Sequence, residues 1–551
     1  MTVDTKRDER VVGNLLRHWA ETRPHDRFVT CGEQSFTYAE LEARATAVAA
    51  GFAALGVAKG DRVAVLSPNR MEMVDMYFGL AKLGAIQVPL NAFLKGEFLR
   101  YQLADSQASV LVVDADGHAA VTPLLDQLPD LRTLVLLDDR PSLHRAGVTE
   151  VALTSAILAG SAPLNSQEIS REDTMSVLYT SGTTGFPKGC VLSHGYYTRV
   201  AKVMDESLGF ADDDSLYTAL PLFHAAARMM VLGAALRRGI PVTVDPAFSP
   251  TGILPRCKEV GATIIIGMGV MGTAMLSVPE RPEDRDHRVH TMSMAPLTPE
   301  NQARFQERFG IDPYVEMFGQ TECVPVLASK RLGVRNRASC GQPADDLEVA
   351  LLDDHGNPVS PGQVGEICLR PRDRYAMFDG YWNNPQAALS QIRGLWYHTG
   401  DHGRALPDGT VTFTDRKKDS LRRRGENVSS MELEAAILTH PKIAEAAVHA
   451  VPSELGEDDI KACLVREPDA KIEPGDLFGF FGEHLPYYAI PRYVEFVEQL
   501  PRNAVGRVMK HKLRDMPLTA SVWDFEKLGL TVKRDERRRG AASVSPGRPA
   551  C

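Results

Sequence analysis

The sequence predicts an α/β protein with layered, mostly parallel sheets, and three observations support this fold class. Helical segments alternate with short apolar strands over residues 36–113, as happens when helices connect parallel strands. The alternation returns in 201–220 and 229–244. Farther along, a helical segment at 431–438 and an alternating strand at 444–451 predict a smaller α+β domain.

The first elements are marked by a helix cap and by segment length. Thr37 precedes an apolar helical repeat that reaches about Leu55, and Glu40 follows three positions later, so we expect a capping box. The next segments have the lengths and apolar content of a strand, a helix and two more strands, at 62–66, 71–83, 85–90 and 109–113.

Composition and charge limit the functional classes. The chain of 551 residues is 44% apolar, as in globular proteins, and has room for about three to four folding units. Its formal net charge of -9 is weak for this length, which argues against general nucleic-acid binding and against attraction to an anionic membrane. The N-terminus has no signal-like segment and no run approaches roughly 18 apolar residues, so we expect a cytoplasmic protein without a membrane span. The eight cysteines form no CxxC pair or Cys/His cluster, so neither a disulfide framework nor a zinc site is predicted.

The stretch Tyr179–Gly189 has the chemistry of a phosphate-binding loop. It follows a short apolar segment, 175–178, that is expected to be a buried strand. Its glycines allow the backbone close to a polyphosphate, its hydroxyls donate to phosphate oxygens, and Lys188 adds a positive charge. The spacing is not GxxxxGK[ST], so an ordinary P-loop fold is disfavoured. The alternative is a Gly/Thr-rich linker with an incidental lysine, but such linkers seldom separate two apolar segments.

These eleven residues resemble the signature of the AMP-forming adenylating superfamily, which includes acyl-CoA synthetases, nonribosomal adenylation domains and firefly luciferases. Further motifs follow in the family's order between about residues 12 and 515, which is hard to obtain by chance. The resemblance implies a large N-terminal domain of several α/β subdomains at 1–415 and a small mobile α+β domain at 416–530. The tail at 531–551 is rich in Arg, Gly, Ser and Pro and is expected to be disordered.

The resemblance also implies which residues bind MgATP. In the loop, Lys188 is the expected catalytic cation, and the nucleotide contacts are Thr180, Ser181, Gly182, Thr183, Thr184 and Gly185. In the motif 316–322, Phe318 and Gly319 would lie near adenine, Thr321 would bond the α-phosphate, and Glu322 would hold Mg2+, a hard cation that prefers carboxylate and water ligands.

Two later motifs complete the nucleotide and coenzyme contacts that the resemblance implies. Asp401 follows a glycine and would offer two acceptors to the ribose diol, although a surface Gly-Asp turn is the alternative. Arg416 would contact the nucleotide and Lys418 would be the hinge of the small domain. Arg422 and Gly425 would serve a coenzyme A arm, and a solvated arginine face is the alternative.

The family's acyl pocket corresponds to three separate segments. His224 would gate the route to the reacting carbonyl, although a histidine after an apolar run is more often structural. The strand at 263–269 would line the pocket with Gly267 and Gly269. Before Ala295 and Pro296, in the adenine loop, the family's two glycines are replaced by Ser293 and Met294. Either Met294 shrinks the cavity, which favours a small or unusual substrate, or it turns into the neighbouring core.

The catalytic lysine of the family is replaced by Arg507. Arginine keeps the positive charge that would stabilise the adenylation transition state, but its planar fork is bulkier and points differently. Lys510, one helical turn later, could substitute for it.

The leading hypothesis is an ATP-dependent, AMP-forming ligase that adenylates a small or aromatic carboxylate and transfers it to coenzyme A. The first alternative is a diazotase-like enzyme that activates nitrite for attack by an aryl amine. A role in secondary metabolism is expected. The second is a nucleotide-binding homologue with impaired catalysis. The acid, the acceptor and the oligomeric state, with a homodimer as one option, are left open.

Overall fold

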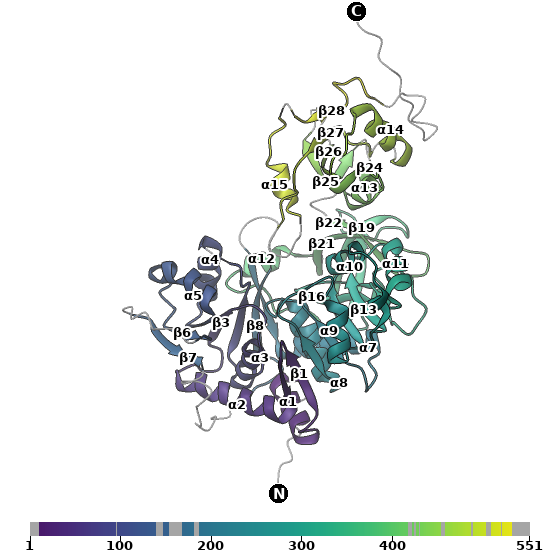
Figure 1. Cartoon of the computed structure of the whole chain (residues 1–551). Helices are drawn as coiled ribbons and strands as arrows, with labels where there is room; N and C mark the ends of the chain where they lie inside the picture. Colours follow the sequence, from purple (N-terminus) through teal and green to yellow (C-terminus); the bar gives the residue numbers. More distant parts are fainter. Residues whose placement is uncertain are drawn as a thin grey trace, which may run out of the picture. The chain divides into compact units, whose positions relative to one another are not determined.

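The computed structural model describes residues 10–94, 96–138, 147–153, 168–180, 187–416, 421–423, 426–428, 430–452, 458–485, 489–502, 508–519 and 521–531 (Figure 1). The chain divides into two compact units. The larger contains Met1–Val349, Leu369–Tyr397 and Asp408–Val411, and the smaller contains Ala350–Cys368, His398–Pro407 and Thr412–Cys551. The expected boundaries at 415/416 and 530/531 stay predictions, and the expected tail beyond Thr531 lies outside the described residues.

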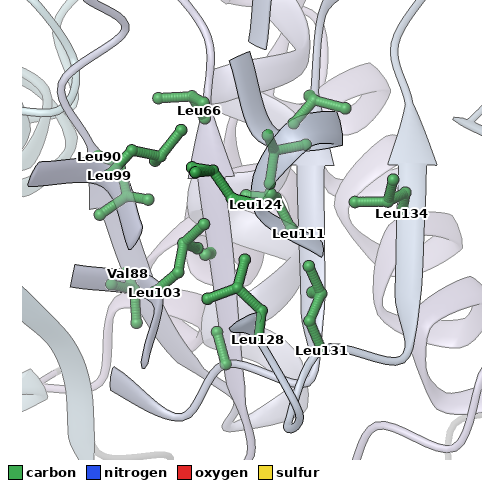
Figure 2. Packing of buried hydrophobic residues seen from close by; sticks show 14 of the residues in the cluster. Leu66, Val88, Leu90, Leu99, Leu103, Leu111, Leu124, Leu128, Leu131 and Leu134 are labelled. Atoms are coloured by element: carbon green, nitrogen blue, oxygen red, sulfur yellow. The ribbon is translucent and has the colours of Figure 1, made fainter. Parts of the chain in front are cut away.

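The first large sheet of the larger unit has the strand order β7-β6-β5-β3-β4-β8-β9. All its neighbours are parallel except the final β8–β9 pair. The strands are β3 (Arg62–Leu66), β4 (Ile86–Leu90), β5 (Val110–Val113), β6 (Thr133–Leu136), β7 (Thr149–Ala152), β8 (Thr174–Thr180) and β9 (Lys188–Ser193). One face carries a leucine-rich core that Figure 2 shows, in which Leu66, Leu111 and Leu134 from three strands meet residues of the covering helices. These helices are α4 (Gly96–Ser106), α5 (Ala115–Val121) and η1 (Thr122–Gln127).

The second large sheet has the order β14-β13-β12-β10-β11-β1-β2 and is parallel except for the β1–β2 edge. Its strands are β1 (Arg27–Cys31), β2 (Gln34–Thr37), β10 (Leu216–Thr218), β11 (Val242–Val244), β12 (Ile264–Met268), β13 (Thr291–Ala295) and β14 (Asp312–Tyr314). The associated helices are α8 (Ala234–Arg238), α9 (Ile253–Val260), α10 (Gly269–Ser277), η3 (Pro282–Arg285), α11 (Pro299–Phe309) and the π-helix η2 (Ala226–Gly233).

Helices that contact both large sheets join them into layers. The ring of Phe28 on β1 stacks on Tyr38 at a centroid distance of 4.7 Å and lies 6.1 Å from Phe78. These partners belong to α2 (Tyr38–Ala54) and α3 (Met71–Leu83), which pack on each other and on α1 (Val12–Thr22), while α7 (His194–Leu208) packs on α8. Because all three rings are buried, this aromatic cluster forms part of the packed core between the sheets.

Two small sheets follow the large ones. The first contains β15 (Met317–Gln320), β16 (Cys323–Ala328) and β17 (Gln342–Pro343). The second has the order β18-β19-β21-β20, with β22 on β21. Its elements are β18 (Leu347–Leu352), β19 (Val364–Pro371), α12 (Pro385–Ser390), β20 (Ile392–Arg393), β21 (Trp396–Ala405) and β22 (Val411–Arg416).

The C-terminal part of the smaller unit is an α+β arrangement. Its sheet, β25-β26-β27-β28, has one face buried against α13 and α14 through Ile460, Leu477 and Phe481. The elements are β23 (Leu421–Arg423), β24 (Glu426–Val428), α13 (Ser430–Ile437), β25 (Ile443–Pro452), β26 (Asp458–Arg466), α14 (Pro474–His484), β27 (Tyr493–Phe496), α15 (Lys510–Arg514) and β28 (Trp523–Asp524).

The predicted α/β fold class with layered, mostly parallel sheets is confirmed. The Thr37–Glu40 capping box is confirmed as well, because Thr37 accepts from the Glu40 backbone N–H and Glu40 accepts from the Thr37 backbone N–H. The predicted helix at 71–83 and strand at 62–66 match α3 and β3 at both ends. Within the described residues, no helix is both long and apolar enough to cross a membrane.

Candidate active site

The β8–β9 hairpin brackets the predicted phosphate loop. Thr180 is the last residue of β8 and pairs with Lys188, the first residue of β9. Gly189 allows the two strands to pack, because a Cβ there would lie 2.5 Å from a methyl group of Val177. The loop residues Ser181, Gly182, Thr183, Thr184 and Gly185 lie outside the described residues.

The segment 379–382 runs beside β9 and brings Tyr381 to Lys188. The Val191 N–H donates to the Gly380 carbonyl at 2.9 Å, and the Trp382 N–H donates to the Gly189 carbonyl at 2.7 Å. The ammonium group of Lys188 consequently lies over the ring of Tyr381, 4.6 Å from its centroid. A cation over an aromatic face is attracted by the ring quadrupole, so Tyr381 offers Lys188 a defined resting position.

Thr321 and Glu322 form the two-residue turn between β15 and β16, whose flanking pair is Gln320 and Cys323. Three hydrogen bonds to the backbone fix this turn and the strand that follows it. The buried hydroxyl of Tyr196 donates to the Thr321 carbonyl at 3.0 Å and accepts from the Val324 N–H at 2.8 Å. The Phe378 N–H donates to the Glu322 carbonyl at 2.8 Å.

Glu322 contacts the hydroxyl of Tyr381, whose ring face is contacted by Lys188. The Tyr381 hydroxyl donates to Glu322 Oε1 at 2.7 Å, in a region where both residues are buried. Burial, followed by the charge of Glu322, raises the pKa of the Tyr381 phenol and of the neighbouring Cys190 thiol. Tyr381 therefore stays a hydrogen-bond donor and Cys190 stays a neutral thiol at ordinary pH.

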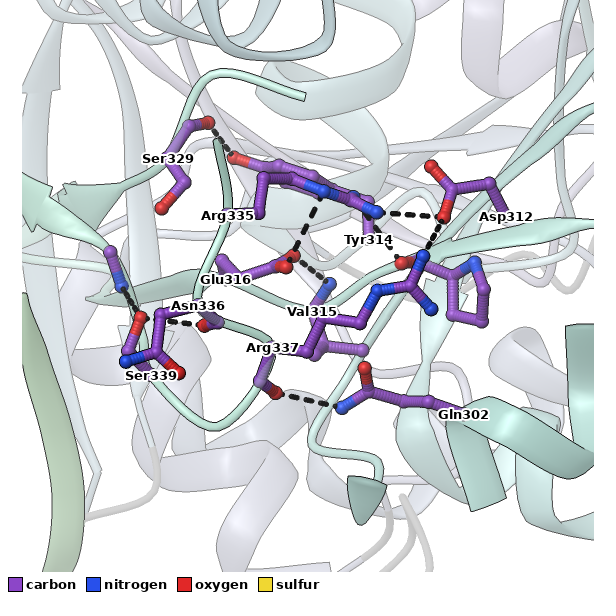
Figure 3. A network of polar contacts seen from close by, with 12 residues as sticks. Gln302, Asp312, Tyr314, Val315, Glu316, Ser329, Arg335, Asn336, Arg337 and Ser339 are labelled. Atoms are coloured by element: carbon purple, nitrogen blue, oxygen red, sulfur yellow. Dashed lines mark hydrogen bonds and ion pairs between the residues drawn. The ribbon is translucent and has the colours of Figure 1, made fainter. Parts of the chain in front are cut away.

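A charged network supports the start of the motif 316–322, as Figure 3 shows. Glu316 is fully buried, and its carboxylate accepts from the Val315 N–H at 2.9 Å and lies 3.6 Å from the Arg335 guanidinium. Arg335 and Arg337 both donate to Asp312, at 2.7 and 2.8 Å. The network ties β14 and Glu316, just before β15, to the segment that follows β16, and so it holds the start of β15 in place.

Phe318 and Gly319 lie on β15, the strand that leads into the turn carrying Glu322. Phe318 pairs with Leu327 and is half-buried. A Cβ on Gly319 would lie 2.9 Å from the Cys323 carbonyl oxygen, so this position has no room for a side chain.

His224 is a half-buried imidazole beside Phe223, with ring centroids 4.7 Å apart. Its Nε2 is buried and has no hydrogen-bond partner among the described residues. Burial lowers the pKa of His224, so the ring is neutral near pH 7. An unpaired buried ring nitrogen is the kind of group that a substrate could satisfy.

The expected pocket residues lie where β12, β13 and α10 meet. Met294 is fully buried, and its terminal methyl group lies 3.0 Å from where a Cβ of Gly267 would be. It also faces Gly272 of α10. This geometry favours the second reading of Met294, in which it turns into the neighbouring core.

Gly269 starts α10 at the closest approach to the expected adenine loop. A Cβ there would lie 1.8 Å from the Pro296 carbonyl oxygen, so only glycine allows α10 to begin beside Ala295 and Pro296. Ser293 is buried on β13, opposite Ile266 in the register.

Asp401 lies on β21 and is buried. Its N–H donates to the Thr399 hydroxyl at 3.1 Å, and that hydroxyl donates to the Ile367 carbonyl at 2.7 Å. Gly400 between them has a φ of +72°, a conformation that favours glycine.

The remaining predicted residues belong to the smaller unit. Lys510 pairs with Glu434 at 2.8 Å and donates to the hydroxyl of Ser430, so its ammonium is engaged by α13. Arg416 ends β22 and Arg422 lies on β23, and only their backbone is described. Lys418, Gly425 and Arg507 lie outside the described residues.

Sequence reasoning missed the roles of Tyr381 and Tyr196. Both contact the Thr321–Glu322 turn although they are at least 59 positions away from it in the sequence, and no local pattern predicts such a contact. The one available signal was the Gly-Tyr-Trp segment at 380–382, whose aromatic residues follow a glycine in a polar region.

Comparison with known proteins identifies what the chain is similar to. Residues 16–382 match the family described as AMP-binding enzyme, and residues 432–507 match the AMP-binding enzyme C-terminal domain. A crotonobetaine/carnitine–CoA ligase of Escherichia coli is 31% identical over 498 residues, which cover 87% of this chain and 93% of that protein.

Solved structures agree with this similarity. The anthranilate CoA ligase AuaEII in complex with anthranoyl-AMP is 26% identical with a TM-score of 0.82, covering 91% of this chain and 96% of its own. ATP-bound MatB from Rhodopseudomonas palustris is 26% identical with a TM-score of 0.81, and the match covers 91% of this chain and 98% of the MatB chain.

Proposed function

The chain belongs to the AMP-binding enzyme family, and we propose that it is an AMP-forming acid–CoA ligase. The observation that carries the proposal is the convergence of the Lys188 ammonium and the Glu322 carboxylate on Tyr381. Adenylation of a carboxylate requires a cation that stabilises the charge on the phosphate oxygens and an acid that can bind the metal ion. Lys188, which follows the predicted phosphate loop, and Glu322, which lies on a fixed turn, are suited to these two roles.

The donor set of the Thr321–Glu322 turn fits Mg2+. A carboxylate and a neighbouring hydroxyl are oxygen donors, which this hard cation prefers, and Tyr381 fixes the carboxylate by one of its oxygens. Glu322, with the Thr321 hydroxyl, would hold the metal, and the bound ion would neutralise phosphate charge. Mg2+ stays a prediction, as do the cytoplasmic location and the hinge at Lys418.

In the proposed first half-reaction, a carboxylate oxygen of the acid attacks the α-phosphorus of ATP and the bond to pyrophosphate breaks. Lys188 and the Thr321 hydroxyl stabilise the negative charge that develops on the phosphate oxygens. Asp401 holds the ribose, and Phe318 and the Ala295–Pro296 segment flank the adenine. Arg507 supplies the second positive charge that stabilises the transition state, and Lys510 is the alternative source of that charge.

In the proposed second half-reaction, the thiol of coenzyme A gives its proton to water, its sulfur attacks the acyl carbonyl, and AMP leaves as the bond from the carbonyl carbon to the phosphate oxygen breaks. The acid–CoA ligase activity named for several similar proteins supports this acceptor. Arg422 and Gly425 stay the proposed contacts for the coenzyme arm. The pocket proposed for the acid includes His224, Gly267, Gly269 and Ser293, with Met294 behind them in the core.

The test is a panel assay that separates the three hypotheses. Purified protein receives MgATP with crotonobetaine, o-succinylbenzoate, anthranilate, benzoate or nitrite, each with and without coenzyme A, and nitrite is also supplied together with an aryl amine. We expect AMP, pyrophosphate and a thioester with at least one carboxylate, and a hydroxamate when hydroxylamine replaces coenzyme A.

Each other outcome points to one alternative. AMP formed only with nitrite and an aryl amine would favour the diazotase-like enzyme. ATP binding without AMP from any substrate would favour the impaired homologue.

A further inference from the structure

The turn that carries Asp401 is held from the neighbouring strand by a buried carboxylate. Glu366 on β19 accepts from the Gly400 N–H through Oε1 at 3.1 Å. Its other oxygen, Oε2, lies 2.9 Å from His398 Nδ1. The side chains of Glu366 and His398 are only 3% and 6% exposed, so the hydrogen bond between them is shielded from water. The bond to the Gly400 N–H is partly buried.

These contacts fix each of the residues that precede Asp401. His398 and Gly400 bond to the carboxylate of Glu366, and Thr399 between them donates to the carbonyl of Ile367. Gly400 adopts a left-handed backbone conformation, in which its N–H direction and the direction of the following residue are coupled. A shift of Gly400 would therefore turn the Asp401 carboxylate.

Burying a carboxylate is costly unless it is well paired, so Glu366 requires an explanation. Both its oxygens act on the Asp401 turn, whereas a purely structural residue at this place could be apolar. Within the described residues, Glu366, Cys368 and His398 are also a geometrically possible metal group. We favour a role in holding the Asp401 turn over a role in metal binding, because the Glu366 oxygens already pair with the His398 imidazole and the Gly400 N–H.

We propose that Glu366, with His398, is a positioning residue for ribose recognition, acting through the Gly400 N–H on Asp401. Glu366 itself touches no part of the nucleotide. The inference rests on the proposed function, because it takes Asp401 as the ribose contact.

The test compares ribose selectivity in the full-length protein. Calorimetry gives the dissociation constants of ATP and 3′-deoxyATP, so the readout does not depend on knowing the acid. We expect the wild-type protein to prefer ATP at least about tenfold, because a site built to bond a hydroxyl rejects an analogue that lacks it. Glu366→Ala should reduce this preference about tenfold through weaker ATP binding, with 3′-deoxyATP binding nearly unchanged.

Two further variants separate positioning from folding. Glu366→Gln keeps an oxygen for the Gly400 N–H, and its amide can donate to the other tautomer of His398, so it should retain the preference to within about threefold. Asp284→Asn removes another buried carboxylate, which bonds Arg308 in the larger unit. It should lower thermal stability and leave the ribose preference unchanged.

The Asp401→Asn variant distinguishes failure of this inference from failure of the proposed site. If it abolishes the preference while Glu366→Ala does not change it, the positioning role is wrong and the ribose role of Asp401 stands. If neither variant changes the preference, Asp401 is not the ribose contact and both ideas fall. Stoichiometric zinc in the purified protein that disappears in Glu366→Ala would instead assign the cluster to a metal.

Discussion

At the scale of single residues, Tyr381 links the two charged groups of the candidate site. We predict that Tyr381→Phe lowers kcat/KM for MgATP about tenfold to a hundredfold, because Glu322 loses a hydrogen bond to a charged oxygen while Lys188 keeps the aromatic ring. Steady-state kinetics over a range of Mg2+ should show a raised requirement for the metal.

A matched control is Tyr375→Phe. Tyr375 is also a buried tyrosine whose hydroxyl donates to a carboxylate, that of Glu172, but it lies outside the proposed machinery. It should leave kcat/KM within about twofold. Equal losses in the two variants would mean that the Tyr381 effect is a general packing effect.

Asp214 provides a pH test of folding stability. Burial raises the pKa of its carboxyl, but hydrogen bonds from His290 and Thr263 outweigh burial and bring the pKa from 3.8 to about 2. Because the folded pKa is below the unfolded one, the stabilisation is complete above about pH 4 and is lost as the pH falls toward 2. The difference corresponds to about 2 kcal/mol.

The measurement is urea unfolding of wild type and Asp214→Asn from pH 7 to pH 2. The variant should be less stable at pH 7, and the gap should narrow below pH 4. A gap that stays constant across this range would contradict the assignment of the lowered pKa to Asp214.

At the scale of elements, the start of α10 depends on one glycine. Gly269→Ala would place a Cβ against the Pro296 carbonyl, so α10 or the Ala295–Pro296 segment must shift. We predict a loss of about 1–3 kcal/mol in denaturant unfolding, with weaker ATP binding. The control is Gly475→Ala at the start of α14, where a Cβ meets no atom within 4 Å. If both variants unfold alike, the close approach is not the cause.

Elements with local signals were predictable from the sequence. The Thr37 cap and the apolar pattern of 71–83 defined α2 and α3, because capping and amphipathic burial depend on neighbouring residues. The strand expected at 263–269 is one residue shorter at each end in the structure, since β12 spans Ile264–Met268 and Gly269 begins a helix. The short β10 and the π-helix η2 depend on packing between the sheets, which local patterns do not report.

The same contrast holds in the candidate site. Lys188, Thr321 and Glu322 could be named from motifs, and β8 places Lys188 opposite Thr180 as a hairpin requires. The groups that orient them, Tyr196, Tyr381 and Glu366, come from other strands and helices. Met294 shows the limit of motif reasoning, because its direction depends on the space left by Gly267 and Gly272.

At the scale of the whole molecule, the proposed catalytic residues are divided between the two units. Lys188 and Glu322 belong to the larger unit, and Asp401 and Lys510 belong to the smaller one. We predict that a chain truncated after residue 415 still binds ATP but forms AMP at least about a hundredfold more slowly, since it lacks Arg507 and Lys510, the residues proposed to supply the second cation. Calorimetry and single-turnover assays check the two parts separately. Equal rates for the truncated and full chains would contradict the assigned role of residues 416–530.

The most direct test of adenylation follows the oxygen atom that is transferred. The best carboxylate from the panel is supplied with 18O in its carboxyl group, together with MgATP and coenzyme A, and the products are analysed by mass spectrometry. With both carboxyl oxygens labelled, we expect one 18O atom in each AMP released, because a carboxylate oxygen attacks the α-phosphorus. Unlabelled AMP, or ADP with inorganic phosphate, would contradict it.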